Sequence, residues 1–289
     1  MKKIKRIAVL GATGMLGNAV LRFFAQKPDY EVHGTVRNWS SVRELQRIAP
    51  SAHFVLGVDV ESLDSLTRMF ATVQPDMVIN CIGIVKQLAD ANDPLIALPI
   101  NALLPHRLAR LAQVAGARLV HMSTDCVFSG AKGNYVEVDL PDAYDLYGRS
   151  KLLGEVDYPN AITLRTSIIG HELAGNRSLI DWFLSQTGEV QGYKNAIFSG
   201  LPTVEIARII HDHVIPNPDL HGLYHVSAEP INKFDLISLV AKEYGKEIAI
   251  RQKDDFVIDR SLNSDRFRAA TGFVPEPWSE LIHRMHEFR

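Results

Sequence analysis

The chain is poor in cysteine, in long apolar runs and in excess charge of either sign. Its 289 residues include two cysteines, Cys81 and Cys126, which are too few for a disulfide framework and lack metal-ligand spacing. We therefore expect a reducing compartment, the cytoplasm. No apolar run reaches the roughly 18 residues of a membrane span, so we expect no membrane partner.

The charges are nearly balanced, because 31 Lys and Arg stand against 33 Asp and Glu. The longest basic block, residues 2–6, is too short to be the footprint of a protein that binds nucleic acid. The uncharged residues 7–21 imitate a secretory signal, but three glycines interrupt them and no small-residue cleavage site precedes Arg22. We expect neither a nucleic-acid partner nor a signal peptide.

The 11 histidines do not predict a metal site. His211 and His213 are two residues apart on a predicted helix and so face different ways. His283 and His286 can share a helix face, but no third ligand is near them in the sequence. We expect no catalytic metal.

Short β-branched or apolar runs alternate with segments of helical spacing through the first half of the chain. The predicted strands lie at 6–10, 31–36, 52–56, 76–81, 118–123 and 161–167. The predicted helices between them lie at 15–26, 41–48, 62–73, 94–115 and 144–156. This order predicts parallel strands with right-handed crossovers, and hence an α/β fold with a Rossmann-type doubly wound parallel sheet.

After about residue 166 the rhythm changes, and glycine, proline and asparagine become frequent. Short predicted strands at 222–226 and 247–251 mix with predicted helices at 178–185, 203–213 and 233–244. We predict a Rossmann domain at 1–165 and a smaller mixed α/β substrate lobe at 166–289. Parts of 195–226 are expected to pack back on the first domain.

Three glycines with the spacing G-x-x-G-x-x-G follow the first predicted strand and open the first predicted helix. Glycine permits the tight turn and a close backbone approach to a pyrophosphate, and the helix N-terminus offers amide donors. No Gly-Lys-Ser/Thr follows, so a nucleoside-triphosphate loop is disfavoured. The sequence predicts dinucleotide binding, with contacts from Gly11, Thr13, Gly14, Met15, Leu16 and Gly17.

The second predicted strand ends without the carboxylate that an NAD site usually places there. Arg37 follows it instead and suits a 2′-phosphate, which favours NADPH as cofactor, with NADH as the other option and a solvated surface arginine as the alternative role. Asp59 and Val60, after the third predicted strand, are candidates for adenine contacts, although Asp59 could equally cap the next helix. Further cofactor contacts are expected from Cys81, Ile82 and Gly83.

A tyrosine and a lysine four residues apart form the candidate catalytic pair, because Tyr147 and Lys151 project from one helical face. An ammonium beside a phenol favours the phenolate, so Tyr147 can protonate a carbonyl oxygen as hydride reaches its carbon. Thr124 ends a predicted strand at the sheet edge where ligands bind and can hydrogen-bond the same oxygen.

At this point the chain resembles the extended short-chain dehydrogenases/reductases, and within them the dTDP-4-dehydrorhamnose reductase-like group. The resemblance covers nearly the whole chain and is carried by residues 11–17, 101–105, 123–130, 147–155, 164–166, 200–203 and 260–264. It implies that Thr124, Tyr147 and Lys151 are catalytic, that Lys151 also holds the nicotinamide ribose, and that the 4-keto group of a nucleotide-linked deoxysugar is reduced. It also suggests a homodimer and a role in cell-surface polysaccharide synthesis.

The same resemblance points to the substrate. It implies that Asp125 and Cys126 line the sugar pocket, although the family usually has tyrosine where this chain has Cys126. It places Arg260 near the substrate diphosphate, with an ion pair to Asp259 or Asp265 as the alternative. Trp182 and Tyr193 are candidates to stack on the base or sugar, and core packing is the alternative. Residues 179–184 and 196–200 are similar to reductases of UDP-linked N-acetyl-6-deoxyhexuloses of the L-fucosamine type.

Three neighbouring functions share part of this residue pattern. Sugar-nucleotide 4,6-dehydratases follow the threonine with an Asp-Glu pair, whereas Asp125 is followed by Cys126, which disfavours dehydration. Epimerase-reductases of the GDP-fucose synthase type carry a cysteine at the position of Cys126 and would need a histidine partner such as His171. The regulatory β subunit of methionine adenosyltransferase also resembles this family, so a non-catalytic dinucleotide-binding role stays an alternative.

Overall fold

The computed structural model describes residues 4–84 and 92–289, and the chain folds as two compact units. One unit consists of Met1–Ser123, Asp145–Leu164 and Pro218–Leu223. The other consists of Thr124–Tyr144, Arg165–Asn217 and Tyr224–Arg289. Unlike the single boundary predicted after residue 165, this division puts Thr124–Tyr144 in the second unit. Pro218–Leu223, in the first unit, lies within 195–226, parts of which are expected to pack back on the first domain.

The early segment is held in the second unit by partners that are distant in sequence. The ring of Tyr135 stacks on that of Phe128 at 4.0 Å, and its backbone N–H donates to the carbonyl of Ser261 at 2.9 Å. His225 Nδ1 lies 3.0 Å from the carbonyl oxygen of Tyr135. Such contacts leave no local pattern in the sequence. The sequence therefore gave no sign that Thr124–Tyr144 belongs to the second unit.

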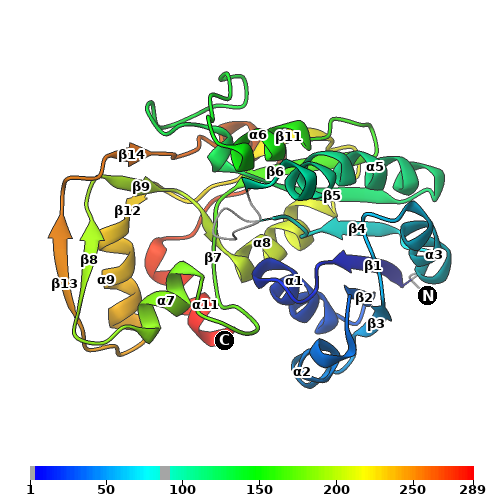
Figure 1. Cartoon of the computed structure of the whole chain (residues 1–289), viewed down its shortest axis with the longest axis horizontal. Coiled ribbons are helices and arrows are strands. Elements are labelled where there is room, and N and C mark those ends of the chain that lie inside the picture. Colours follow the sequence, from blue (N-terminus) through cyan, green and yellow to red (C-terminus); the bar gives the residue numbers. More distant parts are fainter. Residues whose placement is uncertain (1–3, 85–91) are drawn as a thin grey trace. The chain divides into compact units, whose positions relative to one another are not determined.

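A seven-stranded sheet organises the first half of the chain and confirms the predicted Rossmann-type sheet. Its strand order is β11-β6-β5-β4-β1-β2-β3, which Figure 1 shows from β6 at the top to β3 at the bottom. β1 pairs in parallel with β2 and β4, with Ile7 opposite Val32 and Met77. The strands are β1 (Lys5–Leu10), β2 (Tyr30–Val36), β3 (His53–Leu56), β4 (Met77–Asn80), β5 (Arg118–Thr124), β6 (Ala161–Thr166) and β11 (Gly222–His225).

Helices of the first unit follow the strands as predicted, and the inner strands are buried on both sides. All residues from Ile7 to Leu10 are at most 1% exposed, as expected for a parallel sheet covered on both faces. Ala8 and Leu10 pack with Leu66 and Leu108 in one apolar core. The helices are α1 (Met15–Ala25), the 3-10 helix η1 (Trp39–Ser41), α2 (Val42–Ile48), α3 (Leu63–Val73), α4 (Pro94–Ala97), α5 (Leu104–Val114) and α6 (Leu146–Leu153).

The single helix predicted at 94–115 is interrupted. A π-helical segment, η3 (Leu98–Leu103), separates α4 from α5. Pro99 and Pro105 lack the backbone N–H that a continuous α-helical ladder requires at those positions. The prediction of helical structure across this stretch is therefore confirmed, but the change from α-helical to π-helical hydrogen bonding at 98–103 was not predicted.

The second unit is a mixed α/β structure built from short strands. It contains the sheets β12-β9-β14, β13-β8 and β10-β7, and its core joins Ile180, Phe183, Leu236 and Ile282. The strands are β7 (Ile168–Ile169), β8 (Glu189–Tyr193), β9 (Ala196–Phe198), β10 (Leu201–Pro202), β12 (Ile231–Asn232), β13 (Ala249–Lys253) and β14 (Ile258–Asp259). The helices are η4 (Asp125–Val127), α7 (Leu179–Ser185), α8 (Thr203–Ile209), the π-helical η5 (Ile210–Val214), α9 (Lys233–Glu243), α10 (Asp265–Thr271) and α11 (Trp278–Glu287).

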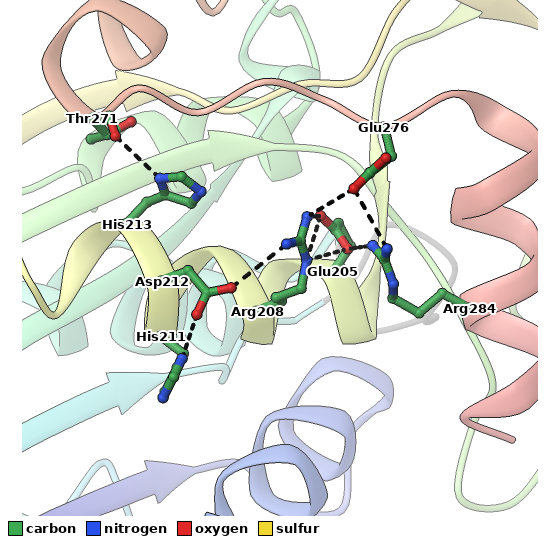
Figure 2. Close-up of polar contacts among 8 residues, drawn as sticks. All are labelled: Glu205, Arg208, His211, Asp212, His213, Thr271, Glu276 and Arg284. Carbon is green, nitrogen blue, oxygen red and sulfur yellow. Dashed lines mark hydrogen bonds and ion pairs between the residues drawn. The ribbon is translucent and has the colours of Figure 1, made fainter.

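A buried carboxylate ties α11 to α8 (Figure 2). Glu205 is 0% exposed, and both of its oxygens accept from Arg208, at 2.6 Å for Nη2 and 3.1 Å for Nε. Arg284 of α11 donates to the same carboxylate, and Glu276 lies 3.8 Å from Arg208 and 3.7 Å from Arg284. The hydrogen bonds that Arg208 donates to Glu205 raise the pKa of Arg208. A buried charge of this kind is tolerated only when it is paired.

Within the ranges that the structure describes, no helix combines the length and the apolar character needed to cross a membrane.

Candidate active site

The glycine turn after β1 has the geometry that a dinucleotide phosphate needs. Gly11 adopts φ +81°, which favours glycine, and a Cβ at Gly17 would lie 1.9 Å from the carbonyl oxygen of Gly11. Gly14 is the N-cap of α1 and offers no side chain to cover the first backbone N–H groups. The turn and the open helix end therefore fit a pyrophosphate.

The other predicted residues of the turn differ in exposure. Thr13 and Gly14 are exposed and Met15 is partly buried, whereas Leu16 is 6% exposed and its side chain belongs to the core. Leu16 can therefore meet a cofactor only through its backbone.

The adenosine-side residues lie at the ends of β2 and β3, which pair in parallel with Val36 opposite Leu56. Arg37 is exposed directly after β2, as a 2′-phosphate partner must be. The cap role considered for Asp59 is wrong, because Ser62 caps α3 by accepting from the N–H of Ser65 at 3.3 Å. Asp59 instead accepts from Glu61 N in the preceding turn at 3.0 Å. Val60 is partly buried against the core.

The segment after β4 connects the glycine turn to the catalytic helix. A Cβ at Gly11 would lie 2.9 Å from Ile82 Cγ1, so the two residues are in close contact. A Cβ at Gly83 would lie 3.4 Å from Asn101 Oδ1 and 3.9 Å from Lys151 Nζ. Burial raises the pKa of Cys81 to about 12, so this thiol stays protonated and uncharged at neutral pH.

α6 carries Tyr147 and Lys151 and begins after Asp145, whose carboxylate accepts from Gly148 N at 2.8 Å. Lys151 is 5% exposed, and its Nζ donates to the carbonyl of Met122 on β5 at 2.6 Å. Burial lowers the pKa of Lys151 to about 8, although Glu155 and Cys81 oppose the shift. Tyr147 is partly buried on the same helix.

Sequence reasoning gave no role to Asn101, which braces this helix. Its side-chain amide accepts from Ile84 N at 2.9 Å and donates to Ile84 O and to Ser150 Oγ, both at 3.1 Å. Ser150 precedes Lys151, so one buried amide joins the segment after β4 to the catalytic helix. The sequence signal that could have pointed to Asn101 is its place in residues 101–105, one of the segments that carry the family resemblance.

Thr124 ends β5 and is 8% exposed. Its Oγ1 accepts from Cys126 N and donates to Asp125 Oδ1, both at 3.1 Å. Thr124 belongs to the second unit, whereas Tyr147 and Lys151 belong to the first. The joint action of the three residues therefore stays a prediction.

The second unit contains a cavity of about 380 Å³ that brings together the four residues predicted to bind substrate, Asp125, Cys126, Trp182 and Arg260. Tyr193 lines it as well. The remaining lining residues are mostly apolar and are Ser167, Leu179, Gln191, Ala196, Ile197, Phe198, Lys233, Ile237, Phe256 and Ile258. Lys233 was not predicted from the sequence as a site residue, because a lysine at the start of a helix is usually solvated.

The charged residues of this cavity are fixed by local contacts. Arg260 donates through Nε to the carbonyl of Phe128 at 2.9 Å and through Nη1 to Cys126 Sγ at 3.7 Å. Burial raises the pKa of Asp125, an effect that Arg260 and Lys233 oppose. Burial likewise raises the pKa of Cys126 to about 12, so the thiolate is scarce at neutral pH. The predicted ion pair of Arg260 with Asp259 or Asp265 does not form.

His171 is not positioned as a partner for Cys126. Its Nδ1 lies 2.6 Å from Asp181 Oδ1 and its Nε2 lies 2.8 Å from the hydroxyl of Tyr244. Both ring nitrogens are thus engaged, and His171 does not line the cavity that contains Cys126.

The histidines considered as metal ligands have other partners. Figure 2 shows His211 paired with Asp212 and His213 with Thr271. His211 Nδ1 lies 2.5 Å from Asp212 Oδ1, and His213 Nδ1 lies 3.2 Å from the carbonyl oxygen of Thr271. His283 Nδ1 lies 2.7 Å from Glu243. Across residues 4–84 and 92–289, no three His, Cys, Asp or Glu side chains are grouped to hold a metal ion.

Comparison with known families gives one match that spans nearly the whole chain. Residues 5–287 match the model of the family described as RmlD substrate binding domain.

Among individual proteins, the chain is 32% identical over 152 residues to methionine adenosyltransferase 2 subunit beta of Rattus norvegicus. That match covers 52% of this chain and 42% of the rat protein, so it spans less than half of the relative. The chain is also 30% identical over 167 residues to the probable low-salt glycan biosynthesis reductase Agl14 of Haloferax volcanii, covering 56% of this chain and 52% of that protein.

Among solved structures, dTDP-4-dehydrorhamnose reductase of Bacillus anthracis, crystallised with NADP, matches with a TM-score of 0.80 over 100% of both chains. Its sequence is 20% identical, so this likeness shows the fold.

Proposed function

Because the chain belongs to the RmlD substrate-binding domain family, we propose that it is an NADPH-preferring reductase of the 4-keto group of a nucleotide-linked 6-deoxysugar. The observation that carries this proposal is the buried ammonium of Lys151, which lies four residues after Tyr147 in the sequence. This ammonium donates a hydrogen bond to the backbone carbonyl of Met122. Burying a cation is costly, and side chains with perturbed pKa values cluster at functional sites, which supports a role for Lys151 in the reaction.

The chemistry follows from the named side chains. A bound nicotinamide dinucleotide would supply the hydride for the carbonyl carbon. Tyr147 gives its phenolic proton to the carbonyl oxygen, and the positive charge of Lys151 favours the phenolate that remains. The Thr124 hydroxyl turns from Asp125 to donate to the same oxygen and fixes its position.

The residues that would hold the cofactor come from the first unit. The glycine turn would bind the pyrophosphate, Arg37 would bind the 2′-phosphate, and Cys81, Ile82 and Gly83 would lie along the dinucleotide. Asp59 and Val60 would contact the adenine.

The sugar nucleotide would occupy the cavity of the second unit, between Asp125, Cys126, Trp182 and Arg260. This sugar nucleotide would be a dTDP-4-dehydrorhamnose-like or a UDP-N-acetyl-6-deoxyhexulose compound. We place the enzyme in the cytoplasm, where its two free cysteines would stay reduced, as a homodimer that serves cell-surface polysaccharide synthesis.

Two other functions are weighed against this proposal. A regulatory role is favoured by the similarity to methionine adenosyltransferase 2 subunit beta, but a purely regulatory protein has no need of Thr124, Tyr147 and Lys151 together. An epimerase-reductase would use Cys126 with a histidine, and the contacts of His171 with Asp181 and Tyr244 count against it.

Cofactor oxidation separates the three functions. The protein is mixed with NADPH and with dTDP-, UDP-N-acetyl- or GDP-linked 4-keto sugars, and the products are analysed by NMR after reaction in deuterated water. Oxidation without ring deuterium at C3 or C5 supports the ketoreductase. Deuterium at those carbons supports the epimerase-reductase, and tight NADPH binding without NADPH oxidation in the presence of any of these sugars supports the regulatory role.

A further inference from the structure

The cavity of the second unit holds a lysine to which sequence reasoning gave no role. Lys233 is the first residue of α9, directly after the N-cap Asn232. Asn232 accepts from Asp235 N at 2.8 Å and donates to Asp235 Oδ2 at 2.5 Å, which fixes this first turn. The Lys233 backbone is therefore rigidly placed at the cavity wall.

The Lys233 ammonium lies over an aromatic ring and has no acceptor of its own within residues 4–84 and 92–289. Its Nζ is 3.8 Å from the centroid of the Phe198 ring. Among the described residues, none accepts a hydrogen bond from it or pairs with it as an ion within 4.0 Å. Burial lowers the pKa of Lys233 to about 8, and the nearby Asp125 and Cys126 oppose the shift. Three N–H donors thus remain available at the wall of a mostly apolar cavity.

The charges around Lys233 leave the cavity with an excess of positive charge. Its ionised side chains are Lys233, Arg260 and Asp125, which is one net positive charge when all three are ionised. Two donor nitrogens of Arg260 are already used by Phe128 and Cys126. A neutral deoxysugar would leave this net positive charge uncompensated, whereas an anion with several oxygens would balance it and accept from the N–H donors of Lys233.

The side chains that line the cavity indicate which class of anion fits it. Trp182, Tyr193 and Phe256 line the same cavity as the two cations. Aromatic side chains offer stacking surfaces for a planar base, and cations suit phosphate oxygens. A nucleoside diphosphate has both groups in one molecule.

We propose that Lys233 is a substrate-binding residue that, with Arg260, holds the diphosphate of the nucleotide-linked substrate. This inference rests on the proposed function for the reacting sugar, but the cavity and its charges are independent of turnover. Tyr193, Asp125, Cys126 and Arg260 are the other titratable or charged side chains that line the cavity with Lys233. Affinity for the diphosphate is accordingly greatest while Lys233 is protonated and falls as the pH rises above the pKa of its amine.

Calorimetric titration with UDP and dTDP tests the proposal without requiring catalysis. Lys233→Met should weaken the better-bound of these ligands about tenfold to a hundredfold, the loss expected for one charge-assisted hydrogen bond. Lys233→Arg should retain most of the affinity because it keeps the charge. Binding of the matching nucleoside, uridine or thymidine, should not change, since it has no phosphate.

Lys242→Met is the matched control, because Lys242 lies on the same helix and is exposed. It should bind the nucleotides like the wild type, and thermal unfolding should show that all variants are folded. An unchanged affinity of folded Lys233→Met for UDP and dTDP would overturn the proposal, as would equal losses for nucleoside and diphosphate or the absence of any binding to the wild type. NADPH oxidation, measured separately, reports on the proposed function, so the two can fail independently.

Discussion

At the scale of single residues, the buried ammonium of Lys151 lowers the stability of the fold and has a proposed role in the reaction. Its pKa of about 8 lies below the ordinary lysine value of 10.5, so the folded state disfavours its charged form. The folding penalty is therefore present below pH 8 and is relieved as the pH rises from about 8 to 10.5. The hydrogen bond to Met122 offsets part of this penalty.

Lys151→Met should separate activity from stability. Removing the ammonium should reduce kcat by at least about 100-fold, because Tyr147 loses the charge that favours its phenolate. The free energy of unfolding should change by less than about 1 kcal/mol, because the lost hydrogen bond and the relieved burial of charge nearly cancel. Steady-state kinetics and urea unfolding measure the two quantities. A variant with full activity would show that Lys151 is only structural.

Arg37 decides between the two nicotinamide cofactors. Because its guanidinium is exposed after β2 and would pair with the 2′-phosphate, Arg37→Ala should raise the KM for NADPH about tenfold or more and leave that for NADH nearly unchanged. Kinetics with both cofactors provide the measurement. Equal effects on the two would count against the pairing.

At the scale of elements, helix α11 depends on a carboxylate that lies on another helix. Glu205 is fully buried between Arg208 and Arg284, so its charge is compensated from two sides (Figure 2). The sequence shows only an amphipathic helix that contains one glutamate. Nothing local indicates that this glutamate points inward.

Glu205→Gln should lower the free energy of unfolding by about 1–3 kcal/mol, since both arginines lose the buried carboxylate and keep, among the described residues, only the longer ion pairs with Glu276 and Asp212. Glu280→Gln is the control, because Glu280 is exposed on α11 and its change should cost less than about 0.5 kcal/mol. Urea unfolding of the two variants tests the difference. Similar midpoints would show that the buried cluster contributes little.

The same scale shows what local patterns can and cannot predict. Alternating apolar and helical spacing located the strands of the sheet within a few residues, because the inner strands β4 and β6 are buried at every residue and β1 and β5 at most of theirs. It missed the π-helical breaks at 98–103 and 210–214, since periodicity does not register which backbone hydrogen bonds form. Asp59 was misjudged as a possible cap because Ser62, three residues later, competes for the same helix end.

At the scale of the whole molecule, motif order predicted more than composition did. The glycine turn and the Tyr147–Lys151 spacing pointed to the dTDP-4-dehydrorhamnose reductase-like group, and the match of residues 5–287 to the RmlD substrate binding domain confirms the family. The cavity brings together Asp125, Trp182 and Arg260, which lie far apart in the sequence. Lys233 could not be predicted in the same way, because its burial depends on tertiary contacts such as that with the Phe198 ring.

The central claim is that Tyr147 is the proton donor of a reductase. The most direct test compares wild type and Tyr147→Phe for NADPH binding and for NADPH oxidation with the 4-keto sugar nucleotide that the wild type turns over. Tyr147→Phe should bind NADPH like the wild type and lose at least about 100-fold in kcat, because the substitution removes only the hydroxyl group that gives the proton. Full turnover by Tyr147→Phe would contradict it.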